Sequence, residues 1–240
     1  AARRQLSSRG VDVVYCNDDT TILPWGVAAS NHNLPVLWHV RSGRKGLLDL
    51  VRTRFADKLI CISEYVLNRF SCCAKAINIP NPVDLDRFYY LNDKRKIRKK
   101  LGLEENGILL IQLGRDVPYK RAEWSLSAMQ VALESGKDVR LIFVGEYSDE
   151  RQKILLMALP RTMHERVRFI GWVASPELYL SAADALLHPA DGEHFGRVFI
   201  EAAACGVPAV AIRSGAASEI VVSGVTGHLA DDYIGFVEAV

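Results

Sequence analysis

The sequence has few of the features that mark a secreted, membrane-spanning or nucleic-acid-binding protein. Its five cysteines are odd in number and show no Cys-x-x-Cys spacing, which is typical of reduced thiols in the cytosol rather than of a disulfide framework or a zinc site. No apolar run approaches the ~18 residues that span a bilayer, and no signal peptide opens the chain. The net charge of +2 is too small to indicate nucleic acid as a partner. We therefore expect a cytoplasmic protein.

The chain also lacks an initiator methionine and a capping signal at its end. It starts with AARRQLSSRG and stops at DDYIGFVEAV, and both stretches have a helical pattern. We interpret the 240 residues as a fragment of a longer protein, cut at both ends. We expect the opening of the first domain and a terminal helix to lie outside it.

Short β-branched runs, by contrast, are abundant and alternate with amphipathic stretches. VDVVYC, GILLIQLG and DVRLIFVGE are three such runs, and KRAEWSLSAMQVALESG lies between the second and the third. Strands that are apolar on both faces and alternate with helices indicate parallel sheets covered on both sides. The sequence therefore predicts an α/β protein with doubly wound, Rossmann-like parallel sheets.

The composition changes once, in NIPNPVDLDRFYYLNDKRKIRKKLGLEENG. Two prolines precede a basic stretch there, and a new strand begins at Gly107. Proline cannot extend a central strand because it donates no hydrogen bond to the ladder. We therefore predict a domain boundary, with an incomplete first domain over 1–90 and a second domain over 91–240.

Two cations follow the first predicted strand of the second domain. That strand ends at Gly114, Arg115 comes next, and Lys120 lies at the predicted start of a helix. Ligands of open α/β sheets bind outside the carboxyl ends of the strands. Two cations at this edge, beside a helix start, suit an anion such as a diphosphate. The spacing alone leaves open that both are ordinary surface cations.

The stretch GEHFGRVFIEAAACG places two acids around another predicted helix start. Free amides at Gly196, Arg197 and Val198 would point out of the first turn, which favours a phosphate site. Glu193 precedes the helix, and Glu201 lies inside it with a side chain that leans back toward the start. Both carboxylates can then accept hydrogen bonds from sugar hydroxyls, Glu201 from a ribose and Glu193 from a hexose. The alternative is a loop acid and a surface acid without a ligand.

This stretch resembles the glutamate–seven residues–glutamate signature of retaining glycosyltransferases with the GT-B fold, in the large group 1 family (family 4 type). In the same order, LGRDVPYKRAEWSLSAM resembles that family's GR-x-x-x-x-K segment, FIGWVASPELYLSAADALLHPA its nucleobase-loop segment, and SGAASEIVVSGVTGHL its closing glycine-containing run. INIPNPVDLDRF resembles its interdomain segment, with Pro82 where glycine is usual. The resemblance covers nearly the whole chain and implies a GT-B-like fold.

The resemblance also implies a role for each site residue. Arg115 and Lys120 match the pair that neutralises the donor diphosphate and the leaving group. Glu193 matches the ligand of the donor sugar, and Glu201 matches the ribose ligand. The other residues implied to bind the donor are Gly114, Gly171, Trp172, Val173, Gly196, Arg197 and Val198, the segment around Trp172 meeting the nucleobase through its backbone. His39, at the end of LPVLWHV, matches a first-domain histidine that touches the donor sugar; a purely structural histidine is the alternative.

The implied activity is retaining transfer of a hexose-type sugar from a nucleotide-diphosphate donor to a hydroxyl of a glycan or lipid-linked acceptor, in polysaccharide, lipopolysaccharide or glycolipid synthesis. The family needs no metal, so we expect no cofactor and interpret Asp84-Leu85-Asp86 as a chance D-x-D. A sugar-nucleotide 2-epimerase-like isomerase and a non-catalytic nucleotide- or glycan-binding relative stay open as alternatives. The basic stretch DKRKIRKK is either a peripheral contact with the inner membrane surface or a solvated helix face.

Overall fold

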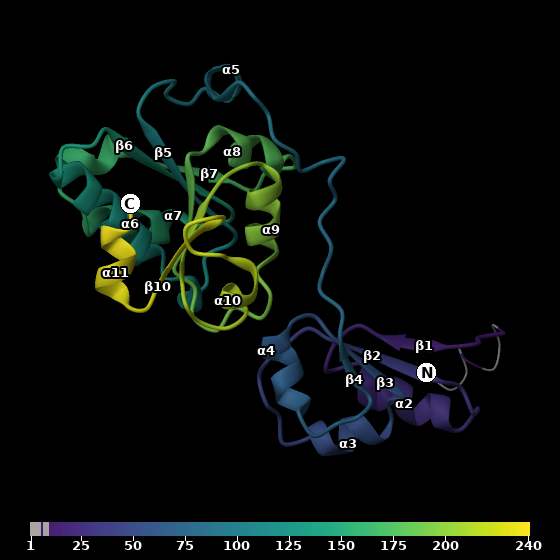
Figure 1. The fold of residues 1–240 in the computed structure, drawn as a ribbon. Coiled ribbons are helices and arrows are strands. Elements are labelled where there is room, and N and C mark those ends of the chain that lie inside the picture. The colour runs from purple at the N-terminus through teal and green to yellow at the C-terminus, as the bar shows by residue number, and fades with distance from the viewer. Residues whose placement is uncertain (1–5, 7–9) are drawn as a thin grey trace. The chain divides into compact units, whose positions relative to one another are not determined.

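The computed structural model of the chain describes residue 6 and residues 10–240. These form two compact units, Ala1–Pro82 and Val83–Val240, each with its own parallel sheet (Figure 1). The stretch AARRQLSSRG, on which part of the fragment interpretation rests, lies largely outside the described residues.

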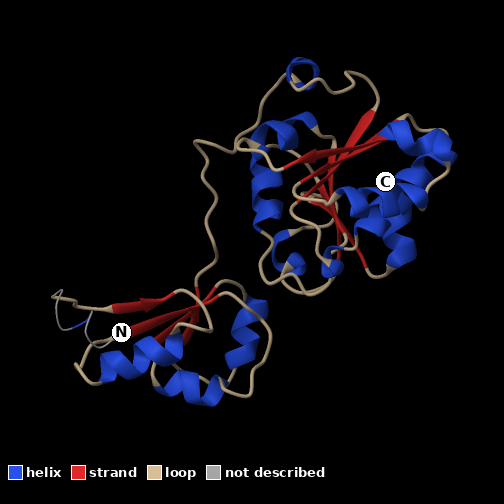
Figure 2. Cartoon of the chain, turned by 180° about the vertical axis from the view of Figure 1, so that it is seen from behind, coloured by secondary structure: helices blue, strands red, loops and turns tan. Residues whose placement is uncertain are grey.

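Unit 1 holds a four-stranded parallel sheet in the order β1-β2-β3-β4. The strands are β1 (Val14–Cys16), β2 (Val36–Val40), β3 (Lys58–Cys61) and β4 (Ala76–Asn78), and the helices are α2 (Ile22–Ser30), α3 (Asp49–Arg54), α4 (Glu64–Leu67) and the 3-10 turn η1 (Asn68–Phe70). In the described part of this unit the helices cover one face of the sheet (Figures 1 and 2). Trp38 and Leu59 are fully buried, whereas Tyr15 on the first strand is exposed.

Unit 2 holds a six-stranded sheet in the order β10-β9-β8-β5-β6-β7, in which every strand pair is parallel. Its strands are β5 (Ile108–Leu113), β6 (Val139–Val144), β7 (Val167–Gly171), β8 (Ala185–His188), β9 (Ala209–Ile212) and β10 (Gly227–Ala230). Its helices are α5 (Lys94–Lys100), α6 (Ala122–Glu134), α7 (Asp149–Met157), α8 (Pro176–Ala182), α9 (Arg197–Ala204), α10 (Ala217–Ile220) and α11 (Tyr233–Glu238), with 3-10 turns η2 (Pro118–Lys120) and η3 (Arg161–Arg166).

Successive strand residues point to opposite faces of a sheet. In this second sheet, helices cover both faces and bury the side chains of each. Leu109 and Ile111 of β5 pack in the core formed with α8 and α9, whereas Leu110 between them packs in the core formed with α6, α7 and α11. The doubly wound arrangement predicted from the apolar runs is therefore confirmed for unit 2.

The strand order reverses between β5 and β8. The chain leaves β5, builds β6 and β7 on one side, and returns to place β8 against the other side of β5. Such a switch point opens a crevice at the carboxyl ends of the two strands, because their connections run in opposite directions. The residues after Leu113 and after His188 lie at that crevice.

Candidate functional site

Two loops meet at the carboxyl ends of β5 and β8. The backbone N–H of Asp191, in the loop after β8, donates to the carbonyl of Tyr119, in the turn after β5, at 3.0 Å. The Arg121 guanidinium pairs with the Asp191 carboxylate at 2.7 Å. These contacts hold the segment that carries Lys120 against the segment that carries Glu193, two residues that sequence reasoning assigned to one site.

Lys120 lies at the end of η2, not at the start of α6 as predicted, because α6 begins at Ala122. Its ammonium reaches back to the carbonyl of Leu113 at 3.5 Å. The absence of a side chain at Gly114 makes this possible, since a Cβ there would lie 2.1 Å from the Lys120 nitrogen. The buried Gln112 amide donates to the Lys120 carbonyl at 3.1 Å and fixes the backbone.

The charge of Lys120 is held in a partly desolvated place. Burial lowers the pKa of Lys120, and the neighbouring charge of Arg115 lowers it further, while the carboxylates of Glu193 and Glu201 raise it. Two cations and two carboxylates therefore share one small region at the switch point. The net effect lowers the pKa, so this ammonium gains from the arrival of an anion.

Glu193 is held by His188, the last residue of β8. The His188 Nε2 lies 3.1 Å from the Glu193 Oε2, and its ring packs edge-on against Phe199. Burial lowers the pKa of His188, so the imidazole is neutral and donates Nε2–H to the carboxylate. Burial opposes the ionisation of Glu193, but the hydrogen bond from His188 and the charge of Lys120 outweigh it and lower the pKa of Glu193.

The backbone of Glu193 is fixed as well. Its carbonyl accepts the N–H of Ala216 at 2.8 Å. Gly215 has a φ of +61°, and a Cβ there would lie 2.2 Å from the Glu193 carbonyl oxygen. The closing run SGAASEIVV, recognised by resemblance but given no site role, thus packs its glycine against the loop of Glu193.

Helix α9 begins directly after Gly196, whose φ of +79° is in the left-handed region. The amides of the first turn, including those of Arg197 and Val198, have no acceptor inside the helix. Glu201 is buried, which contradicts the surface-acid alternative for this residue. Its carboxylate accepts a hydrogen bond from the Arg197 side chain at 3.0 Å, a contact the sequence reasoning did not foresee.

A cavity of about 460 Å³ lies at the carboxyl ends of β5, β6 and β7. Its lining joins Gly114 and Arg115 to Trp172 and Val173, so these four predicted residues fall in one place. Gly171, also predicted, ends β7 directly before Trp172. Two further residues that sequence reasoning missed, Gly145 and Glu146, also line it. The glycine after the apolar run DVRLIFV was the available signal, because a Cβ at Gly145 would lie 2.2 Å from the Gly114 carbonyl oxygen.

His39 lies near the end of β2 in unit 1, as predicted from its place in the apolar run. Its Nδ1 is hydrogen-bonded to the hydroxyl of Tyr15, a neighbour that the sequence did not indicate. Burial lowers the pKa of His39, and the charge of Arg41 adds to the effect. All the other predicted site residues belong to unit 2.

Among residues 6 and 10–240, no three His, Cys, Asp or Glu side chains gather as a metal site requires. In the D-x-D segment, the Asp84 carboxylate accepts the backbone N–H of Asp86 at 3.0 Å, which is a local turn contact. No helix in the described part of the chain has the length and apolar character needed to cross a membrane.

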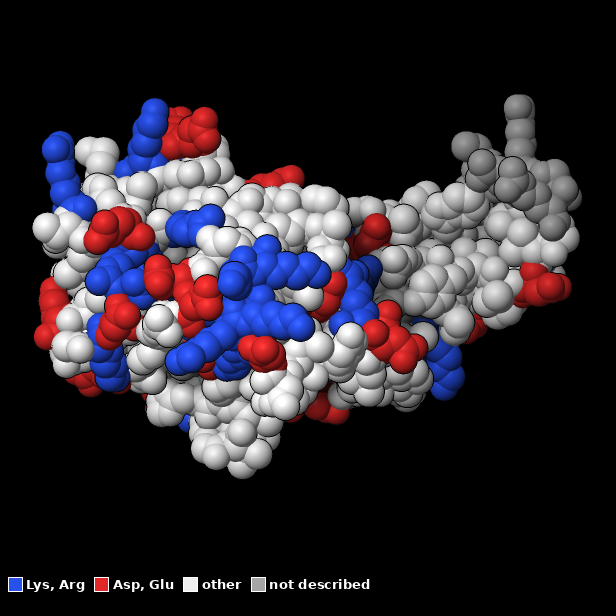
Figure 3. All heavy atoms as spheres, turned by 90° about the horizontal axis from the view of Figure 1, so that it is seen from above, with Lys and Arg blue, Asp and Glu red and all other residues white. Residues whose placement is uncertain are grey.

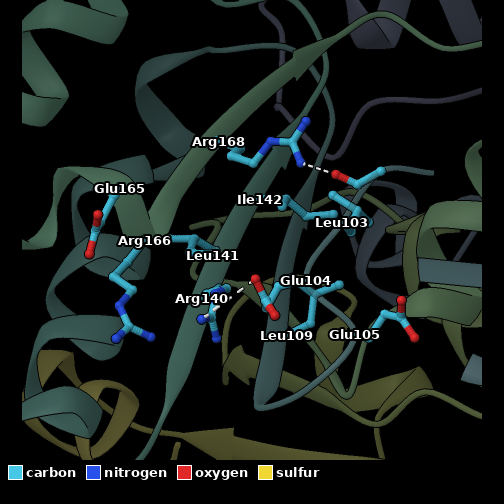
Figure 4. A pocket seen from close by; sticks show the side chains of 11 residues that line it. Leu103, Glu104, Glu105, Leu109, Arg140, Leu141, Ile142, Glu165, Arg166 and Arg168 are labelled. Carbon is cyan, nitrogen blue, oxygen red and sulfur yellow. Dashed lines mark hydrogen bonds and ion pairs between the residues drawn. The ribbon is translucent and has the colours of Figure 1, made fainter. Parts of the chain in front are cut away.

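A second cavity, of about 390 Å³, lies at the amino ends of β5, β6 and β7, the edge opposite the switch-point crevice (Figure 4). Its arginines are engaged by the protein. Arg166 pairs with Asp138, and Arg140 pairs with Asp138 and Glu104. Arg168 donates to the carbonyl of Gly102. With these cations already neutralised or bonded, the cavity does not compete with the switch-point crevice as an anion site.

Comparison with known proteins agrees with this geometry. The family profile described as "Glycosyl transferases group 1" matches residues 93–240. The chain is 32% identical over 210 residues to a GDP-mannose-dependent monoacylated alpha-(1-6)-phosphatidylinositol monomannoside mannosyltransferase of Corynebacterium glutamicum, a match that covers 81% of this chain and 54% of that protein. It is 34% identical over 160 residues to a D-inositol 3-phosphate glycosyltransferase of Segniliparus rotundus, a match that covers 65% of this chain and 35% of that protein. The chain thus spans about half, or less, of the length of these relatives.

Solved structures show the same fold. HepE of Anabaena, crystallised with UDP and glucose, superposes with a TM-score of 0.82 at 24% identity, over 99% of this chain and 69% of that one. Sucrose-phosphate synthase of Thermosynechococcus elongatus superposes with a TM-score of 0.77 at 23% identity, over 99% of this chain and 65% of that one. With the two parallel sheets and alternating helices of this chain, these neighbours confirm the GT-B-like fold class predicted from sequence.

Proposed function

The chain belongs to the group 1 glycosyltransferases, and we propose that it forms the donor-binding part of a retaining enzyme. In this proposal a hexose-type sugar moves from a nucleotide-diphosphate donor to a hydroxyl acceptor. One observation carries it above the others. The charges of Arg115, Glu193 and Glu201 all act on Lys120, which lies at the switch point between β5 and β8. A doubly wound sheet binds its nucleotide at such a point.

The proposed chemistry follows from the charges. The leaving diphosphate gains negative charge as the bond to the sugar carbon breaks, and Lys120 and Arg115 are placed to balance that charge. First-turn amides of α9 supply further donors to the phosphates. Glu193 stays ionised and oriented by His188, so its carboxylate can accept a hydrogen bond from a sugar hydroxyl. Glu201 accepts from a ribose hydroxyl in the same scheme, and His39 contacts the donor sugar.

In the retaining reaction that we propose, the acceptor oxygen bonds to the sugar carbon on the face that the diphosphate leaves. The acceptor proton passes to the departing phosphate, so no protein nucleophile takes part. The cations replace a divalent metal, and no cofactor is required. EDTA should therefore leave transfer unchanged.

Two other functions compete with this one, a sugar-nucleotide 2-epimerase-like isomerase and a non-catalytic binding relative. The held orientation of Glu193 supports catalysis, since binding of nucleotide alone needs no carboxylate held in place at the sugar position. In the full-length protein, Glu193→Ala should abolish transfer while nucleotide binding is kept. Unchanged transfer would remove the role proposed for Glu193, and an epimerised product would favour the isomerase.

By their names, the Corynebacterium relative depends on GDP-mannose and is a phosphatidylinositol monomannoside mannosyltransferase, and the Segniliparus relative is a D-inositol 3-phosphate glycosyltransferase. For this chain we propose a glycan or lipid-linked acceptor, a cytoplasmic location and a contact with the inner membrane surface. A place in polysaccharide, lipopolysaccharide or glycolipid synthesis follows from that acceptor class.

Thermal unfolding of this chain with UDP, GDP or ADP, in EDTA, tests the donor site directly. A nucleotide at 100 times its Kd should stabilise the folded state by about 2.7 kcal/mol. Lys120→Ala should abolish the shift, while Lys153→Ala, a change at an exposed lysine on α7, should keep it. No shift with any nucleotide, from folded protein, would contradict the proposal for this chain.

A further inference from the structure

Segment 41–54 of unit 1 shows several large apolar side chains to solvent. Leu47 is 101% exposed and Leu50 is 82% exposed, and Leu48 and Val51 are exposed as well. No residue of α3, which forms the second half of the segment, is buried. Burial of a leucine is favourable by about 1.5–3 kcal/mol, so a cluster of exposed ones marks a surface that meets another apolar phase.

The charges around these side chains are almost all positive. Residues 41–54 contain five Lys or Arg side chains and one acid, Asp49. Arg41, Arg44, Lys45 and Arg54 are exposed beside the leucines. Asp49 is turned inward, where it pairs with Arg69 at 2.5 Å and with Arg52 at 3.2 Å. The outward side chains are therefore apolar or cationic.

The segment is held in this arrangement by a buried cation. The Arg69 guanidinium is shielded from solvent, pairs with Asp19 at 2.7 Å and donates to the Ser42 carbonyl at 2.8 Å. The Gly46 N–H donates to the Asp49 carboxylate at 2.8 Å. Arg69 thus holds both ends of the loop before α3, one through the Ser42 carbonyl and the other through Asp49. This keeps the leucines from packing back against unit 1.

We propose that segment 41–54 is a docking surface for an anionic lipid bilayer. Leu47 and Leu50 enter the boundary between headgroups and acyl chains, and the flanking cations contact the anionic headgroups. The charges of the segment favour this occupant. Its apolar side chains are surrounded by cations, and its one acid is paired inside the unit. An anionic bilayer matches this arrangement, because its headgroups are negative and its acyl chains below them are apolar. The inference does not depend on the donor site of unit 2.

Helix α5 is another strongly basic surface, and it lacks the apolar component. Lys and Arg side chains gather over it, with acidic side chains around them (Figure 3). Its Ile97 packs against the core of unit 2, and Lys94 and Arg98 both pair with Asp184. The basic stretch singled out in the sequence is therefore the poorer membrane contact, and it serves as an internal comparison.

Co-sedimentation of this chain with vesicles tests the surface. The vesicles contain phosphatidylglycerol and phosphatidylcholine, or phosphatidylcholine alone. The expected result is binding to the anionic vesicles only. Leu47→Ser with Leu50→Ser should lower the partition coefficient on the order of tenfold or more, because two apolar side chains no longer enter the bilayer. Arg44→Glu with Lys45→Glu should lower it by a similar factor.

Two matched variants control for general effects. Ile154→Ser with Met157→Ser removes comparable exposed apolar surface from α7, and Lys99→Glu with Lys100→Glu reverses two exposed charges on α5. Both should bind vesicles like the unaltered chain. The proposal is overturned if the chain does not bind anionic vesicles or binds neutral vesicles equally well. It is also overturned if the control variants lose as much vesicle binding as the segment variants. Loss of self-association in the leucine variant, without vesicle binding, would assign the surface to a second copy and overturn it too.

The nucleotide-induced thermal shift is measured on the same samples. Vesicle binding without any nucleotide shift would support the docking surface and contradict the donor site. A nucleotide shift without vesicle binding would support the donor site and contradict the docking surface. The failures of the two proposals are therefore distinguishable.

Discussion

The Nε2 of His188 lies 3.1 Å from the Oε2 of Glu193, at the end of the strand that borders the switch point. A neutral, buried imidazole thus donates to the carboxylate that we propose as the ligand of the donor sugar. His188 is the last residue of β8, and this hydrogen bond gives it a larger part in the site than packing alone.

Replacing His188 separates the contact from the packing. In His188→Phe the ring still packs on Phe199 but Glu193 loses its donor, whereas His188→Gln keeps an N–H donor. We expect the phenylalanine variant to bind a nucleotide sugar roughly tenfold to hundredfold more weakly, since a hydrogen bond to a charged group contributes about 1.5–3 kcal/mol. Affinity for the nucleotide diphosphate alone should not change, and the glutamine variant should recover part of the loss. Calorimetric titration measures all three, and an equal loss for the bare nucleotide would mean general collapse.

The same pair makes stability depend on pH. Burial lowers the pKa of His188 in the folded state, so the unfolded state binds its proton more tightly. The free energy of unfolding should therefore fall as pH drops below the ordinary histidine value of about 6.5. His188→Phe removes this slope, and urea unfolding at several pH values above and below that point would reveal it. An identical slope in the variant would place its origin elsewhere.

Lys120 is expected to reduce stability while supporting binding. Its pKa is lowered in the folded state, so its charge at neutral pH opposes folding. Lys120→Met should raise the Tm of the free protein and weaken nucleotide binding by roughly 30-fold or more, as expected when one partner of a buried charge contact is removed. Lys153→Met, at the exposed site on α7, should change neither. Scanning calorimetry with and without nucleotide measures both effects, and a lower Tm for the free Lys120→Met protein would contradict the electrostatic account.

Gly114 makes room for Lys120, and this can be tested against a matched glycine. Gly114→Ala places a Cβ 2.1 Å from the lysine nitrogen, whereas Gly136 has a positive φ but open space around it. Both changes should cost about 1–3 kcal/mol in backbone strain. Only Gly114→Ala should also weaken nucleotide binding, because the ammonium must move. Equal binding by the two variants would show that the position of Lys120 does not matter for the ligand.

Arg69 is expected to support much of unit 1. Removing it in Arg69→Met leaves Asp19 and Asp49 without their shared cation, which should destabilise the unit by about 3 kcal/mol. The pKa of Asp49 is lowered despite burial, mainly by its hydrogen bond from Arg69, so this stabilisation should disappear as pH falls below the ordinary aspartate range. Limited proteolysis should show earlier cleavage within 1–82, with 83–240 protected as before. Unchanged cleavage would contradict this role.

The sequence by itself determined the kind of elements and the edge at which the site forms. Runs such as GILLIQLG become buried strands because their residues are apolar on both faces, and the polar residues that follow them must lie at the carboxyl edge. That was enough to predict Arg115, Lys120, Glu193 and the helix start at Gly196. Glycines at 114 and 196 carried a local signal, since both hold backbone conformations that other residues avoid.

Only the tertiary structure decided which strands are neighbours and which charges meet. Pairing of β5 with β8 joins residues more than seventy positions apart, and local patterns carry no information on such contacts. The His188–Glu193 hydrogen bond, the burial of Glu201 and the inward turn of Asp49 toward Arg69 all depend on that packing. A side chain's pKa and exposure are set by the atoms around it, and those atoms come from distant parts of the chain.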